Sequence, residues 1–161
     1  MFDLVNGLPV HPLVVHAVVV LLPLACLGTI AIVVRPAWRE RYGVIVVACA
    51  AVTTVLIPVA TSSGEALEER VGEPGAHAEM GDTLLWFAIP LLLLSAALVW
   101  IDRRRRAGHD SGRADGPRVV QVVAALALVA AVAASVQVYR VGDSGARAAW
   151  GTKVSSSEAS G

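Results

Sequence analysis

Three of the four histidines in this chain lie at borders of apolar segments that are predicted, from the charges of the links described below, to share one side of a membrane with several carboxylates. His11 and His16 open the first apolar segment, and His77 lies between the second and the third. The carboxylates at these same borders are Glu65, Glu68, Glu69, Glu79, Asp82 and Asp143. Imidazole together with carboxylate is the ligand set of zinc, iron, manganese and copper(II) sites. The residue types therefore indicate a candidate site for a divalent transition metal or for haem.

The spacing of these residues decides which of them could bind the same metal ion or haem. His11 and His16 are five positions apart, which is about 500° of rotation and leaves them roughly 140° apart on a regular helix. We expect His11 to precede the helix as its cap, from where it folds back toward His16. Haem needs axial ligands on opposite sides of the porphyrin, an arrangement that suits His16 and His77 across a bundle. The primary candidates are His11, His16, Glu65 and His77, and the secondary ones are Glu68, Glu69, Asp82 and Asp143.

A purely structural interpretation of the same residues stays open. Ser62 and Glu65 form a capping-box pattern for a short acidic helix. Asp82 is placed to cap the third apolar helix. In this interpretation His16 donates to a carbonyl of a neighbouring helix, and the acidic segment is a solvated face.

The composition restricts the class of protein that carries these residues. Of the 161 residues, 56% are hydrophobic and 16% are charged, and 13 basic residues balance 13 acidic ones. Soluble domains are about 45–50% apolar and about 25% charged. The absence of a basic excess excludes a nucleic-acid-binding protein, and the high hydrophobicity excludes a disordered chain. The remaining class is an integral membrane protein in contact with the lipid bilayer.

Four long segments carry no formal charge, and each is long enough to cross a membrane. About 20 apolar residues span the roughly 30 Å hydrocarbon core as a helix. The sequence therefore predicts an all-α integral membrane protein, a bundle of four transmembrane helices within one domain over residues 1–150. The predicted helices are residues 12–34, 43–62, 83–101 and 119–140, with a short acidic helix at 63–72 and a disordered tail at 151–161.

The links between these helices differ in charge. The links after the first and third helices hold nine arginines, whereas the link after the second holds Arg70 among six carboxylates. Basic links stay in the cytoplasm, so both termini are predicted to lie outside. The nine arginines are Arg35, Arg39, Arg41, Arg103, Arg104, Arg105, Arg106, Arg113 and Arg118.

The polar residues inside the spans favour some functional classes over others. No ionisable side chain lies at mid-membrane, so a small transporter or channel ranks last. The sequence contains no nucleophile–base pair and no glycine-rich phosphate loop, so we predict a non-enzymatic protein. In the fourth helix Ala127, Ala131 and Ser135 recur every four residues. Such spacing lets helices approach closely and indicates a central helix, a homodimer interface or a contact with a membrane-complex partner.

Three segments resemble a bacterial family of membrane proteins known as domain of unknown function 2231. They are LPVHPLVVHAVVVLLPLA at residues 8–25, ATSSGEALEERVGEPGAHAEMGD at 60–82 and YRVGDSGARAAW at 139–150. The resemblance implies a four-helix protein of the bacterial plasma (inner) membrane. It places the characteristic polar positions at His11, His16, Glu65, His77 and the segment 142–150, and many members have histidine where this chain has Asp143. Two functions stay open: binding of a metal ion or haem at the His/Glu cluster, and a structural or accessory subunit without a cofactor.

Overall fold

The computed structural model describes residues 4–5, 8–71, 76–108 and 117–158, with side chains over 11–64, 80–108 and 118–147. Four helices account for most of this chain: α1 (Val10–Val34), α2 (Trp38–Val71), α3 (Ala76–Arg106) and α4 (Pro117–Glu158). Ahead of α1, the two-residue strands β1 (Leu4–Val5) and β2 (Leu8–Pro9) pair antiparallel.

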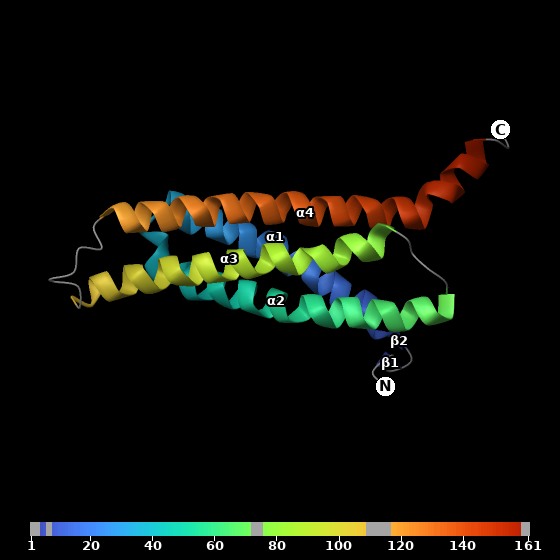
Figure 1. The fold of residues 1–161 in the computed structure, drawn as a ribbon, viewed down its shortest axis with the longest axis horizontal. Helices are drawn as coiled ribbons and strands as arrows, with labels where there is room; N and C mark the ends of the chain where they lie inside the picture. Colours follow the sequence, from blue (N-terminus) through green and yellow to red (C-terminus); the bar gives the residue numbers. More distant parts are fainter. Residues whose placement is uncertain (1–3, 6–7, 72–75, 109–116, 159–161) are drawn as a thin grey trace.

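The four helices run alongside one another as an up-and-down bundle (Figure 1). Each helix packs on the next along the chain, and α4 packs back on α1. The start of α1, the end of α2, the start of α3 and the end of α4 therefore lie at one end of the bundle (Figure 1). The α1–α2 turn, the end of α3 and the start of α4 lie at the other. The antiparallel order follows from short links, which force consecutive helices to reverse direction.

All four helices have the length and composition of membrane spans. The apolar stretches cover His11–Val34, Trp38–Gly64, Met80–Arg106 and Arg118–Arg147. The shortest has 24 residues, which at about 1.5 Å per residue is enough for the roughly 30 Å hydrocarbon core. The predicted class, an all-α integral membrane protein with four transmembrane helices, is confirmed.

Apart from the end of α1, which was predicted at residue 34 and lies at Val34, the helix ends differ from the predicted ones in the direction of longer helices. The acidic segment is no separate helix: α2 continues without a break to Val71. Ser62 does not cap it, because its hydroxyl donates to the carbonyl of Pro58, 2.8 Å away, one turn back. Similarly, α4 continues to Glu158 through most of the tail predicted to be disordered. Adding a residue to an existing helix costs far less free energy than nucleating one, so long helices extend past the apolar segment.

Small residues set how closely the helices pack. A Cβ atom on Gly28 of α1 would lie 2.7 Å from Val46 Cγ2, and one on Gly43 of α2 would lie 2.8 Å from Val99 Cγ2. Ala127, Ala131 and Ala134 of α4 are fully buried within the bundle. The small residues Ala127, Ala131 and Ala134 of α4 therefore pack inside this chain, whereas several bulky residues of α4 face outward, among them Val122, Val129 and Val136.

Candidate functional site

His11 connects the first turn of α1 to the end of the apolar part of α2. Its Nδ1 atom lies 2.9 Å from the carbonyl oxygen of Ala60 and 3.2 Å from Ser63 Oγ. The Ser63 hydroxyl donates to the same Ala60 carbonyl at 3.0 Å. A Cβ on Gly64 would lie 3.0 Å from His11 Cε1, so the missing side chain at position 64 makes room for the imidazole ring.

The expected role of His11 as a cap outside the helix is wrong. The helix begins at Val10, so that His11 and Pro12 both lie within its first turn. Proline is tolerated there because the first N–H groups of a helix have no intrahelical partner. The His11 ring consequently points across to α2 and does not fold back toward His16.

His16 lies one turn further along α1, on an exposed face. Its Nδ1 atom is hydrogen-bonded to the carbonyl oxygen of Pro12, four residues earlier in the same helix. The predicted bond to a neighbouring helix is thus replaced by one within α1. His11 faces α2 and His16 is exposed, so the structure does not bring the two rings together.

The hydrogen bonds of both rings fix the position of the ring proton. A carbonyl oxygen only accepts, so Nδ1 of His11 and Nδ1 of His16 each carry the hydrogen that they donate. In the neutral imidazole the other nitrogen, Nε2, then holds a lone pair. No contact of either Nε2 atom with a polar group is present among the described side chains.

The other predicted site residues fall into two groups. Asp82 is exposed in the second turn of α3 and does not cap that helix, because α3 begins earlier, at Ala76. Asp143 lies in α4, where Oδ2 accepts from Arg147 Nε at 2.9 Å. The side chains of Glu65, Glu68, Glu69 and His77 lie outside the described residues. Within the side chains that are described, no three His, Cys, Asp or Glu residues form a group suited to a metal ion.

One polar contact joins α3 and α4 at this end of the bundle. The buried Gln137 donates from Nε2 to Thr83 Oγ1, 2.7 Å away. The Thr83 hydroxyl in turn donates a hydrogen bond to the carbonyl oxygen of Met80, 2.8 Å away. We call this end, with His11, His16, Ser63, Thr83 and Gln137, the histidine end.

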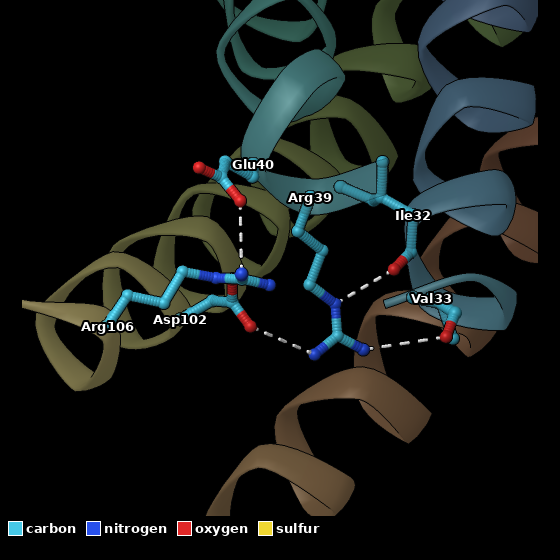
Figure 2. Close-up of polar contacts among 6 residues, drawn as sticks. All are labelled: Ile32, Val33, Arg39, Glu40, Asp102 and Arg106. Atoms are coloured by element: carbon cyan, nitrogen blue, oxygen red, sulfur yellow. Dashed lines mark hydrogen bonds and ion pairs between the residues drawn. The ribbon is translucent and has the colours of Figure 1, made fainter. Parts of the chain in front are cut away.

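The opposite end contains a network that the sequence reasoning missed. Arg39, in the first turn of α2, is only 5% exposed. Its Nε donates to Ile32 O at 2.8 Å and its Nη2 lies 3.5 Å from Val33 O, so it holds the last carbonyls of α1 (Figure 2). Its Nη1 lies 3.6 Å from Asp102 Oδ1 of α3.

The network continues from α3 back to α2. Arg106 donates from Nε to Asp102 Oδ2 at 2.8 Å and from Nη1 to Glu40 Oε2 at 3.1 Å (Figure 2). Two arginines and two carboxylates thus tie together the ends of three helices. We call this end, with Arg35–Tyr42, Trp100–Arg106 and Arg118, the arginine end. The sequence feature that could have indicated this network is Asp102, a single carboxylate directly ahead of four arginines.

Residues 7–158 match the protein family described as "Predicted membrane protein (DUF2231)". The chain belongs to this family. The match spans the histidine end and the arginine end alike, in agreement with the resemblance seen in the sequence. No curated protein and no solved structure is similar enough to the chain to count as a match. The family's description names a membrane protein and no activity, so any role for this member rests on its own residues.

Proposed function

We propose that this member of the family is a non-enzymatic membrane protein that binds a divalent transition metal or haem iron at its histidine end. The observation that carries the proposal is the state of the two rings: Nδ1 of His11 and Nδ1 of His16 are both bonded to backbone carbonyls. Histidines that ligate metals almost always donate their second ring N–H to a carbonyl or carboxylate, which orients the ring and leaves Nε2 for the metal.

The chemistry of the surrounding residues supports the same proposal. His11 packs against Gly64 of α2, and the next turn of that helix contains Glu65, Glu68 and Glu69. Imidazole with carboxylate suits zinc, iron, manganese or copper(II). His16, on the exposed face, is the candidate for an axial haem ligand, with His77 as the opposite one.

The proposal is tested by metal analysis of the full chain purified in detergent. Elemental analysis and a visible spectrum are recorded for the native protein, for His11→Ala, for His16→Ala and for His109→Ala. His109 lies in the sequence between α3 and α4, away from the predicted ligands, so its substitution is a matched control. We expect stoichiometric metal or a Soret band in the native protein and in the control, with at least a tenfold loss in one of the other two variants, the range typical of metal-site changes. Absence of both signals after supplementation with metal and haemin refutes the proposal.

A structural or accessory role is a second candidate, favoured by the contact of His11 with α2. The bonds to Ala60 and Ser63 give this histidine a use that needs no ligand. A partner helix would then pack on the outward face of α4, which exposes Val122, Val129 and Val136. Purification in a mild detergent tests this role: a stable, stoichiometric partner supports it, and a chain that elutes alone at its own mass contradicts it.

We propose further that the arginine end faces the cytoplasm of a bacterium and that both termini lie outside the plasma membrane. The support is the excess of arginine between α1 and α2 and between α3 and α4. The helix ends that these segments join lie at the same end of the bundle (Figure 1). A reporter enzyme that is active only in the periplasm, fused after Gly161, should be active. Activity of a cytoplasm-specific reporter at the same position contradicts this orientation.

A further inference from the structure

Backbone hydrogen bonds and the buried Arg39 side chain fix the α1–α2 turn at the arginine end. Its backbone closes the turn, with Trp38 N donating to Arg35 O at 2.9 Å and Arg39 N to Pro36 O at 3.2 Å. The buried Arg39 side chain binds the end of α1 and approaches Asp102 of α3. The side chains that the turn projects outward are therefore presented on a fixed support.

Four of these outward side chains form a continuous row of two arginines and two aromatic rings. The guanidinium carbon of Arg35 lies 5.2 Å from the centroid of the Trp38 ring. The Trp38 and Tyr42 rings meet edge to face, with centroids 5.8 Å apart. The guanidinium carbon of Arg41 lies 5.5 Å from the Tyr42 centroid. All four residues are exposed, so the row lies on the surface of the bundle.

No carboxylate among the residues that the structure describes neutralises the positive charge of this row. Among the described residues, neither Arg35 nor Arg41 has a carboxylate within ion-pair distance. The arginine end contains eight described arginines and two described carboxylates, a net charge of +6. Both carboxylates, Glu40 and Asp102, are already engaged by Arg106 and Arg39. The row therefore attracts an anion from outside the chain.

We propose that the row Arg35–Trp38–Tyr42–Arg41 binds the phosphate of an anionic phospholipid. Tryptophan and tyrosine favour the headgroup level of a bilayer, and the planar guanidinium fork matches phosphate with two hydrogen bonds. One turn beyond Tyr42, Ile45 is 59% exposed on α2 and offers an apolar surface for the acyl chain of the same lipid. A soluble phosphate lacks this acyl contact, and a zwitterionic headgroup offsets the phosphate with its own cation.

Native mass spectrometry of the full chain in detergent micelles tests this site. Bound lipid is counted during titration with phosphatidylglycerol and with phosphatidylcholine of identical acyl chains. The test variant is Arg35→Gln/Arg41→Gln, and the matched control is Arg140→Gln/Arg147→Gln, which removes two exposed arginines from the opposite end of the bundle. An arginine near an anionic membrane surface contributes about a factor of five in affinity. We expect the apparent affinity of the test variant for phosphatidylglycerol to fall roughly 25-fold.

The control variant and two competition measurements complete the test. We expect less than a twofold change in the control variant, weak binding of phosphatidylcholine, and no displacement of phosphatidylglycerol by millimolar inorganic phosphate. Equal losses in the two variants would mean that lipid responds only to total charge, which overturns the proposal. An unchanged test variant, or displacement by inorganic phosphate, overturns it as well. Because both arginines are exposed, circular dichroism should show the same helix content in every variant.

Discussion

The two ends of the bundle use their polar residues in different ways. At the arginine end, Arg39 is buried and satisfied by the α1 carbonyls and Asp102, and Arg106 binds Asp102 and Glu40. At the histidine end, the contacts between helices are separate hydrogen bonds, from His11 to Ala60 and Ser63 and from Gln137 to Thr83. One end joins three helices through charge, whereas the other joins them in pairs and leaves the Nε2 atoms of both histidines without a polar partner among the described side chains.

This difference predicts that the two ends contribute unequally to stability. A buried charge whose partner is removed is left without compensation, which costs several kcal/mol. A single neutral hydrogen bond contributes only about 1 kcal/mol. We therefore expect substitutions at the arginine end to affect unfolding strongly, and those at the histidine end to affect it weakly. We expect the metal binding proposed above to depend more on the histidine end than on the arginine end.

The largest effect is expected from Arg39→Leu. The substitution removes the bonds to Ile32 and Val33 and the ion pair with Asp102, and we expect the free energy of unfolding to fall by about 2–4 kcal/mol. Reversible unfolding in mixed detergent micelles measures it. Arg41→Leu, in the same turn but exposed, is the matched control and should change stability by less than about 0.5 kcal/mol. Equal effects of the two substitutions would show that burial of Arg39 has no consequence.

The next effect is expected from Gly43→Ala near the arginine end. The new Cβ would lie 2.8 and 3.1 Å from the two methyl groups of Val99, so rotating the valine does not relieve the clash. We expect a loss of about 1–2 kcal/mol, the cost of overpacking less the gain in helix propensity. Gly64→Ala at the histidine end, where the His11 ring is 3.0 Å away, should cost less than Gly43→Ala, because a side-chain ring can shift more easily than a packed valine. Gly81→Ala has nothing within 4 Å and should stabilise α3, so a loss there contradicts this reasoning.

A smaller effect is expected from His11→Ala at the histidine end. Loss of the Nδ1 bond to Ala60 and Ser63 should lower the free energy of unfolding by about 1 kcal/mol. His16→Ala removes a bond within α1 only and should cost less than half of that. The measurement is the same micelle unfolding, with metal removed by a chelator so that ligand binding does not contribute. A larger loss of unfolding free energy for His16→Ala than for His11→Ala would contradict the conclusion that His11, and not His16, joins two helices.

The smallest effect is expected from Gln137→Leu. Hydrogen bonds between membrane helices contribute about 0.6 kcal/mol on average, and this substitution removes one, to Thr83. Gln121→Leu, an exposed position of the same helix, is the control and should have no measurable effect. If Gln137→Leu proves as costly as Arg39→Leu, the contrast between the two ends is wrong.

Much of the fold could be predicted from the sequence, but the helix ends could not. Hydropathy located the four spans because crossing the membrane depends on the average of about 20 residues, not on any single contact. The caps predicted from Ser62, Asp82 and His11 were wrong, because each of these residues lies inside a helix that extends past the apolar segment. Capping patterns are local, whereas the extent of a helix also depends on how it packs on its neighbours.

The candidate site was predicted only by residue type. The sequence identified His11 and His16, but the partner of His11 lies 49 residues away along the chain. Arg39 appeared as one of nine similar arginines in the basic links, and only its contacts with the end of α1 and with α3 distinguish it. The ligand roles of Glu65, Glu68, Glu69 and His77 remain predictions, because their side chains lie outside the described residues.

The sequence by itself determined the membrane class, the number of spans and the separation of arginines from carboxylates along the chain. These properties depend on composition over a helix length, which packing does not alter. Only the tertiary structure decided which arginine turns inward, which helices meet at Gly28 and Gly43, and which nitrogen of each histidine is hydrogen-bonded. The physical reason is range: hydrogen bonds and close packing act over about 3–4 Å, so they depend on which atoms the fold brings together.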